Sequence, residues 1–156
     1  MRKIIYILIA VFFLGCTKSI NIEYGEMIQQ ENSSLIGTWD GELFCSSCES
    51  DRYRYTLVIN SHTNNIAEGT LKETKIPEQQ DYILFNVKIN IDNNTLEITT
   101  TDVIEEVTSK TGVYWCKENT YVLQLSSSKK TLNGEWISSG NCSVFNDSNT
   151  IKINKQ

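Results

Sequence analysis

The chain contains one histidine and one proline, and alanine is scarce among its 156 residues. The single histidine, His62, lies in a polar turn segment without a nearby nucleophile pattern, which argues against a catalytic dyad or a histidine-rich metal site. The chain also lacks Gly-x-Ser-x-Gly, His-Glu-x-x-His and a phosphate-binding glycine loop. We therefore expect a protein that is not an enzyme and that needs no cofactor.

The first fifteen residues have the pattern of an export signal. Arg2 and Lys3 form a positive head, Ile4–Leu14 is apolar and uncharged, and the small Gly15 follows. A membrane-spanning helix needs about 20 apolar residues, which is more than this run offers. The pattern therefore predicts a signal that is removed.

The end of this signal, Phe13-Leu14-Gly15-Cys16, resembles the lipobox of bacterial lipoproteins. The resemblance implies cleavage after residue 15 and acylation of Cys16 with diacylglycerol and palmitate-type chains. It divides the chain into a signal peptide (1–15), an acylated tether (16–34) and one domain (35–156). Thr17, which is not aspartate, favours the outer membrane over the inner one within the bacterial cell envelope. An ordinary secretory signal is the alternative.

The mature chain is acidic. Removing Arg2 and Lys3 lowers the count of basic residues from 14 to 12 against 19 acidic ones, which leaves a net charge of −7. An acidic domain is a poor partner for nucleic acid and is repelled by anionic headgroups. We therefore expect the membrane to be reached through acylated Cys16.

From Leu35 onward, apolar residues recur at every second position, which is typical of a strand with one buried face. The clearest run is Ile83–Ile91. Further strands are expected at 35–43, 53–59, 66–73, 95–101, 113–116, 121–127, 131–138 and 150–154. Many short strands joined by Asn, Ser and Gly turns predict an all-β fold, an antiparallel up-and-down meander of about eight strands. Closure into a barrel is favoured over a sandwich because it removes exposed edges.

Two loops interrupt this pattern. Lys72–Asp81 is polar and contains the only proline, Pro77. In Asp102–Gly112, the spacing of Asp102 and Glu105 fits a capping box, and Gly112 fits a helix end. This segment predicts a short helix, and an extension of the preceding strand is the alternative.

Leu35–Trp39 and Leu132–Trp136 share the pattern Leu-x-Gly-x-Trp, so we expect both tryptophans to fill one region of the core. Gly37-Thr38-Trp39 also resembles the opening Gly-x-Trp of lipocalin-like (calycin) barrels. That resemblance implies an eight-stranded barrel around an apolar pocket and a late arginine that covers the tryptophan, whereas Arg54 is the last arginine here.

The strand pattern points one set of large side chains into the barrel, and these are the candidate ligand-binding residues: Trp39, Tyr53, Tyr55, Leu57, Phe85, Val87 and Trp136. Gly37, Gly41 and Gly69 share the inward face and leave volume that a ligand can occupy. The alternative is a solid core, because eight strands can also be filled by their own side chains.

Four further cysteines, Cys45, Cys48, Cys116 and Cys142, form an even set in an exported chain and favour disulfides. If Leu125 faces Leu132, the same ladder brings Cys116 beside Cys142. Cys45 and Cys48 then pair with each other or stay reduced. A four-cysteine zinc site is the rival, but strand directions place Cys45 and Cys116 at opposite barrel ends.

These observations favour a lipid-anchored binding module for a small apolar ligand. The alternative is an inhibitor or envelope-assembly lipoprotein that contacts a protein partner through the loops 72–81 or 102–112. The acidic residues Glu49, Asp51, Glu105 and Glu106 could form acid pairs, but a charged, solvated loop explains them as well.

Overall fold

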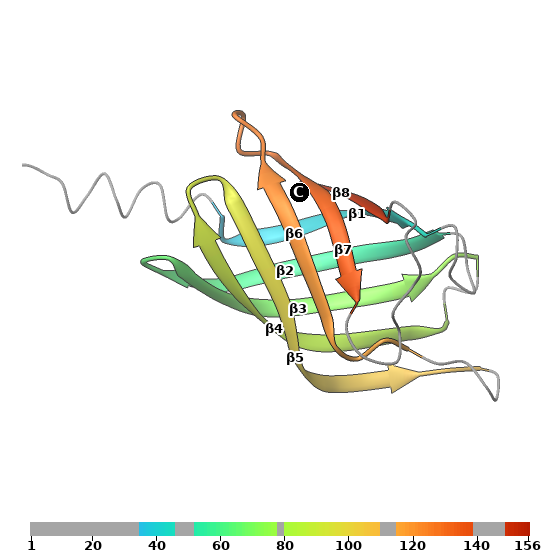
Figure 1. Cartoon of the computed structure of the whole chain (residues 1–156). Helices are drawn as coiled ribbons and strands as arrows, with labels where there is room; N and C mark the ends of the chain where they lie inside the picture. The colour runs from blue at the N-terminus through green and yellow to red at the C-terminus, as the bar shows by residue number, and fades with distance from the viewer. Residues whose placement is uncertain (1–34, 46–51, 78–79, 110–114, 139–148) are drawn as a thin grey trace, which may run out of the picture.

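The computed structural model describes residues 35–45, 52–77, 80–109, 115–138 and 149–156 (Figure 1). Within these ranges the chain forms strands and no helix. The strands are β1 (Gly37–Phe44), β2 (Arg52–Thr63), β3 (Ile66–Lys75), β4 (Tyr82–Asp92), β5 (Thr95–Val107), β6 (Asn119–Leu125), β7 (Thr131–Ser138) and β8 (Thr150–Lys155). The described residues contain no helix that is long and apolar enough to span a membrane. The predicted signal peptide and tether lie outside the described residues.

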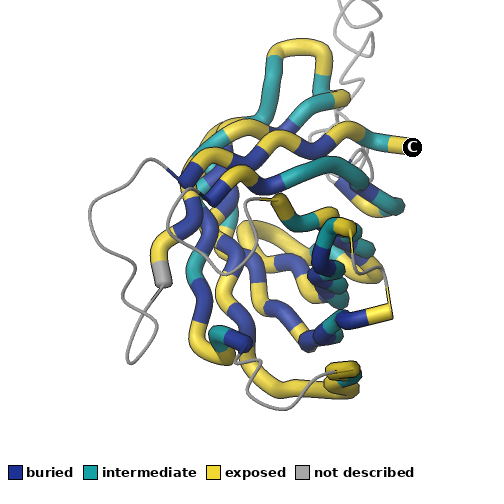
Figure 2. Tube along the Cα trace, turned by 90° about the vertical axis from the view of Figure 1, so that its right-hand side faces the viewer, coloured by how far each residue is buried: buried dark blue, intermediate teal, exposed yellow. Residues whose placement is uncertain are grey.

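The strands form a closed antiparallel barrel in meander order, which confirms the predicted fold class. Each strand pairs with its neighbours in sequence, and β1 closes the ring by pairing with both β2 and β8. Along much of the barrel, and most regularly in β4, buried and less buried residues alternate (Figure 2), because successive strand residues point to opposite faces of the sheet. Asn64 and Asn93 adopt positive φ angles in tight turns, a conformation that asparagine tolerates better than most residues.

The barrel has two different ends. The loop end is where β1, β3, β5 and β7 finish and β2, β4, β6 and β8 begin; the arrowheads of β3 and β5 point to it in Figure 1. The hairpin end lies opposite and carries the turns 64–65, 93–94 and 126–130.

Trp39 fills the core near the hairpin end. Its side chain is fully buried, and its Nε1 donates a hydrogen bond of 3.0 Å to the carbonyl oxygen of Leu35. Lys155 Nζ lies 5.6 Å from the centroid of the indole ring. Lys155, on the last strand, therefore places a cation near Trp39, where the resemblance to lipocalin-like barrels implies an arginine.

The two tryptophans of the repeated pattern do not share one region, so this prediction is wrong. Trp39 pairs with Lys155 at the end of β8, whereas the backbone N–H of Trp136 bonds to Asn149, which precedes β8. The two indoles therefore lie toward opposite ends of the barrel. β1 and β7 flank the same strand, but the pattern occurs early in one strand and late in the other.

Gly41 and Gly69 do not leave empty volume for a ligand, so the expectation is wrong at these two inward glycines. A Cβ atom added to Gly41 or Gly69 would lie 2.0 Å from a backbone carbonyl oxygen of β8 or β2, respectively. At Gly134 the corresponding distance to β6 is 1.9 Å. Glycine is needed there because neighbouring strands approach closely as the sheet curls into a barrel.

The predicted helix in Asp102–Gly112 is also wrong over the described residues. β5 continues to Val107 and pairs with β4 as far as Tyr82. The register shifts near Phe85, so the hydrophobic alternation is lost although the strand continues. The capping-box spacing was therefore misleading, and the alternative of a longer strand is correct.

Residues 113–114 of the predicted strand 113–116 lie outside the described residues, and the described remainder belongs to no strand, which changes the strand count and the expected positions of the cysteines. Trp115–Lys117 belong to no strand, so Asn119–Leu125 is the sixth strand and not the seventh. Its direction is therefore reversed relative to the prediction. Cys45 follows the end of β1 and Cys116 precedes the start of β6, so both lie at the loop end.

Candidate ligand-binding site

The buried polar residues of the described chain gather at the loop end. They are Glu73, Lys75, Asp81, Thr100, Asn119 and Asn149. The opposite half of the interior is apolar, with residues such as Ile59, Leu96 and Leu132 almost completely buried. Burying polar groups costs free energy unless they find partners. The interior is therefore apolar toward the hairpin end and polar toward the loop end, and a ligand can form hydrogen bonds at the loop end.

A carboxyl group between two phenols forms the centre of this polar region. Glu73 on β3 pairs in register with Tyr55 on β2, and Tyr121 of β6 donates a hydrogen bond to Glu73 Oε1. Tyr55 also hydrogen-bonds to the carboxylate. The two tyrosine rings meet edge to face, with centroids 5.6 Å apart. We call Tyr55, Glu73 and Tyr121 the interior triad.

Burial raises the pKa of Glu73 to about 7, although the hydrogen bonds from Tyr121 and Tyr55 favour its ionised form. Burial likewise raises the pKa of Tyr55 and Tyr121 well above the usual value. Both phenols therefore remain protonated hydrogen-bond donors. The triad combines an acid that titrates near neutral pH with two neutral donors.

A hydrogen-bonded bridge supports the wall next to the triad. The pairing of β5 with β6 ends at Thr99 opposite Thr120. Beyond this point, Trp136 Nε1 donates to Asn119 Oδ1 at 3.0 Å, and Asn119 Nδ2 donates to the carbonyl oxygen of Cys116 at 2.8 Å. From β5, Thr100 Oγ1 donates to the carbonyl oxygen of Lys117 at 2.9 Å and accepts from the backbone N–H of Asn119 at 2.9 Å, so this side chain replaces the missing strand contacts where β5 and β6 separate.

Trp115 lies against this region without belonging to a strand. Its ring packs edge to face on Tyr53, with centroids 6.2 Å apart. Trp115 Nε1 is buried and has no hydrogen-bond partner, and neither has Asn149 Oδ1, which also lies at the loop end. An unsatisfied buried polar atom costs about 1–3 kcal/mol. The loop end therefore offers one donor and one acceptor that a bound molecule or water can use.

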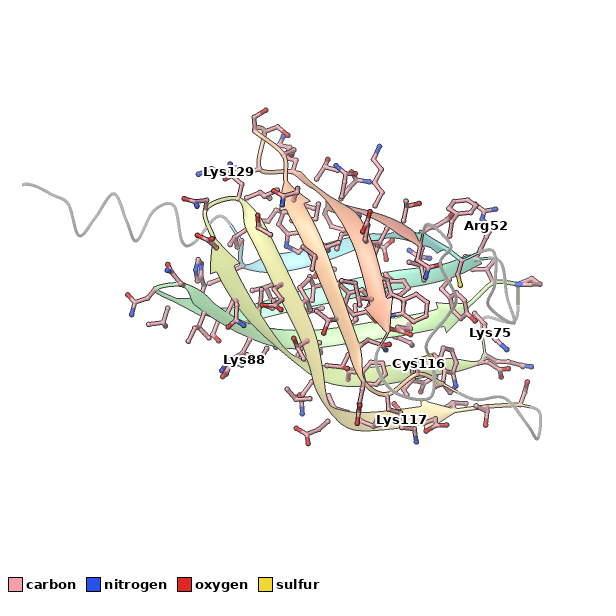
Figure 3. All side chains as sticks on the ribbon, viewed as in Figure 1. Arg52, Lys75, Lys88, Cys116, Lys117 and Lys129 are labelled. Atoms are coloured by element: carbon pink, nitrogen blue, oxygen red, sulfur yellow. The ribbon has the colours of Figure 1, made fainter. Side chains whose placement is uncertain are left out.

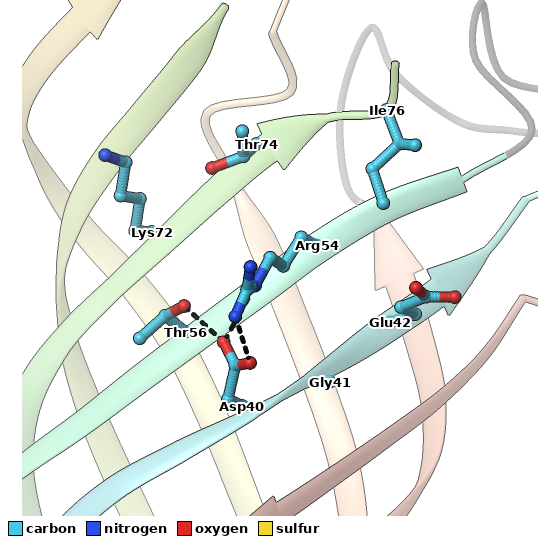
Figure 4. Close-up of a pocket in the computed structure, with 8 residues that line it drawn as sticks. All are labelled: Asp40, Gly41, Glu42, Arg54, Thr56, Lys72, Thr74 and Ile76. Atoms are coloured by element: carbon cyan, nitrogen blue, oxygen red, sulfur yellow. Dashed lines mark hydrogen bonds and ion pairs between the residues drawn. The ribbon is translucent and has the colours of Figure 1, made fainter. Parts of the chain in front are cut away.

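A shallow pocket of about 660 Å³ lies on the outer face of the barrel (Figure 4). Asp40 Oδ2 lies 2.6 Å from Arg54 Nη2, and Thr56 Oγ1 donates to Asp40 Oδ1 at 2.7 Å. The hydrogen bond from Arg54 lowers the pKa of Asp40. Because these charges satisfy one another on an exposed surface, we treat this cluster as a stabilising one. The pocket is lined by Asp40, Gly41, Glu42, Arg54, Thr56, Lys72, Thr74 and Ile76.

The seven predicted interior residues all face the core. Six are buried, namely Trp39, Tyr55, Leu57, Phe85, Val87 and Trp136, while Tyr53 is partly buried and packs against them. The structure brings Tyr53, Tyr55 and Trp136 to the loop end, whereas Trp39 lies near the hairpin end.

Sequence reasoning missed Glu73, Tyr121 and Trp115. The parity of β3 contained a usable signal, because Glu73 is two residues after the inward-facing Leu71. The expected strand 66–73 ends at Glu73, where it overlaps the expected polar loop 72–81, whereas β3 continues to Lys75. Figure 3 labels Lys75 and Cys116 toward the loop end and Lys129 toward the hairpin end.

Of the four domain cysteines, the structure describes Cys45 and Cys116. Cys45 is fully buried and Cys116 packs partly buried against the core. The register on which the 116–142 bridge was predicted is confirmed, since Leu125 pairs with Leu132. Cys16, Cys48 and Cys142 lie outside the described residues. Within the described ranges, no group of three or more His, Cys, Asp or Glu side chains is arranged to hold a metal ion.

Comparison with known proteins does not assign the chain to a family: no protein-family model matches it, and no curated protein matches it.

Proposed function

We propose that this protein is a bacterial envelope lipoprotein whose barrel is a non-enzymatic binding module for a small, largely apolar ligand. Acylated Cys16 would tether it to a membrane, with the outer membrane favoured over the inner one. The ligand would lie at the loop end, with a polar group on the interior triad and an apolar body on the neighbouring aromatic rings. One observation carries this proposal: the buried polar groups are concentrated at one end of an otherwise apolar barrel.

The distribution of chemistry within the barrel supports binding more than catalysis. His62, the only histidine, is at the hairpin end, where its Nε2 lies 2.7 Å from the carbonyl oxygen of Asn64. Glu73 lies at the opposite end among aromatic rings. A carboxyl and two phenols held by hydrogen bonds can orient a polar group.

Membrane attachment through Cys16 is tested by fractionating cells that express the full chain. We expect the Cys16→Ala variant to leave the membrane fraction, while the neighbouring Thr17→Ala variant stays in it. Acyl chains contribute about 0.8 kcal/mol per buried methylene, so their loss should release an acidic domain. A Cys16→Ala protein that remains membrane-bound would disprove the anchor.

Ligand binding is tested by native mass spectrometry of protein purified from its own host. We expect a small molecule to be retained and to be lost in a Tyr121→Phe/Glu73→Gln double variant. A protein that carries no small molecule but retains a protein partner would favour the alternative function.

That alternative, a protein-binding inhibitor or assembly factor, rests on one exposed apolar pair. Val103 and Ile104 on β5 are 39% and 49% exposed, beyond the part of β5 that pairs with β6. If this pair contacts a partner, Ile104→Ser should abolish co-purification. The matched control is Ile66→Ser, because Ile66 is 46% exposed at the hairpin end.

We further propose that the four domain cysteines form two disulfides. Neither Cys45 nor Cys116 is without a partner, and the two connections that carry Cys48 and Cys142 start and finish at the loop end. Since both connections are bounded by strand ends at the loop end, pairing across the two connections competes with the predicted pairs 45–48 and 116–142. Non-reducing peptide mapping distinguishes these pairings, and unmodified thiols at all four positions would refute the proposal.

A further inference from the structure

We propose that the loop end recognises a ligand through a protonated amine, which binds the carboxylate of Glu73 between Tyr55 and Tyr121. The inference rests on the proposed binding function and specifies the chemical class of the ligand. It also excludes a class, because an anionic ligand such as a fatty acid carboxylate would be repelled at this position.

Within the part of the chain that the structure describes, the Glu73 carboxyl group receives no hydrogen bond from a charged side chain. The hydrogen bonds to the Glu73 carboxyl come from neutral phenols, Tyr121 and Tyr55. Its neighbour in register on β4 is the apolar Ile83. A buried carboxylate whose hydrogen-bond donors are neutral gains most from a cation that also donates hydrogen bonds. A primary ammonium group has that chemistry.

Aromatic rings line the interior next to the Glu73 carboxyl group. The rings of Tyr55 and Tyr121 adjoin the carboxyl group, and the Tyr53–Trp115 pair lies two register positions further toward the loop end. Cations are attracted to the faces of such rings, and the attraction grows when water is excluded. Tyrosine and tryptophan together with a carboxylate thus favour an organic ammonium ion.

The loop end also holds a buried hydrogen-bond donor without an acceptor, Nε1 of Trp115. Trp115 precedes β6 and belongs to no strand, so its backbone is not held by a β-ladder. A ligand with a hydroxyl or carbonyl oxygen near its amine would satisfy this N–H and could reach the triad by displacing the indole.

Binding of an amine should depend on pH. The titratable groups that face Glu73 from the surrounding strands are Tyr53 and Tyr55 on β2, Lys75 on β3 and Tyr121 on β6. The carboxyl group of Glu73 itself changes charge near neutral pH, because burial raises its pKa to about 7. Affinity for a protonated amine should therefore rise as the pH increases through about 7, since the carboxylate forms.

The test compares benzylamine, benzyl alcohol and benzoate, which share one ring and differ in charge. Each is titrated calorimetrically into the full chain in detergent. We expect benzylamine to bind at least tenfold more tightly than benzyl alcohol, and benzoate not to bind. Equal binding of all three, stronger binding of benzoate, or failure of all three to bind would overturn the inference.

Variants then locate the bound amine. Glu73→Gln should weaken benzylamine binding at least about tenfold, since the ammonium would lose its buried counter-charge. The control Glu68→Gln changes an exposed glutamate of the same strand and should have no effect. Should Glu73→Gln fail to fold, Tyr121→Phe serves instead: losing a donor raises the pKa of Glu73 and moves the pH dependence of binding upward. Unchanged affinity in Glu73→Gln, or an unmoved pH dependence in Tyr121→Phe, would refute the site.

The ligand that co-purifies from the host separates this inference from the proposed function. A retained molecule without an amine would refute the inference and leave the binding function intact. Retention of an amine that survives Glu73→Gln would also place the recognition elsewhere in the barrel.

Discussion

Replacing Glu73 by glutamine should stabilise the protein at neutral and alkaline pH and have little effect in acid. Burial raises the pKa of this carboxyl from 4.5 to about 7. Between these values the folded chain holds a proton that the unfolded chain has released, so stability falls as the pH rises. Each pH unit in this window costs about 1.4 kcal/mol, and the full window costs about 3 kcal/mol. Above about pH 7 the contribution of Glu73 no longer changes.

Urea unfolding of the full chain, followed by tryptophan fluorescence from about pH 4 to about pH 8, measures this difference. Glu73→Gln keeps an oxygen that accepts the hydrogen bond from Tyr121, so it removes mainly the titration. The unfolding free energy of the variant minus that of the original chain should grow from near zero to about 3 kcal/mol across this range. Glu68→Gln, which changes an exposed residue of the same strand, should show no such growth.

A difference that stays constant with pH would refute this reasoning. It would mean that Glu73 titrates alike in the folded and unfolded chains and that burial does not control its protonation. A difference of opposite sign, with the variant less stable at high pH, would show instead that the carboxylate is stabilised by a cation.

Three further predictions use the same unfolding assay. Gly69→Ala should destabilise the barrel by on the order of 3 kcal/mol, because its Cβ would lie 2.0 Å from a carbonyl oxygen of β2; a stable variant would show that the strands can separate there. Asp40→Asn should cost no more than about 1 kcal/mol near neutral pH, since Arg54 is 59% exposed. Because the hydrogen bond from Arg54 lowers the pKa of Asp40, that cost should disappear as the pH falls through the folded-state pKa, and a cost that persists in acid would contradict it. Lys155→Met should cost about 1 kcal/mol by removing the cation over Trp39, and an unchanged midpoint would show that the contact contributes nothing.

The alternation of side chains made much of the fold predictable. Tyr55, Leu57, Phe85 and Val87 recur at every second position, and each is buried as expected. The β6–β7 register was likewise predictable, because a short turn sets Leu125 opposite Leu132. The helix predicted from Asp102 onward was wrong. A register shift disturbs the hydrophobic alternation there, so the sequence of a strand has the pattern of a capped helix.

The sequence by itself determined that the chain forms short strands with one apolar face, since a period of two is a local property of each segment. The tertiary structure decided which residues meet across the barrel. Glu73 and Tyr121 are 48 positions apart, and their contact depends on the closure of the ring. It also decided that the inward glycines make room for neighbouring backbone, and that Cys45 and Cys116 share one end, because one strand fewer reverses the direction of every strand that follows.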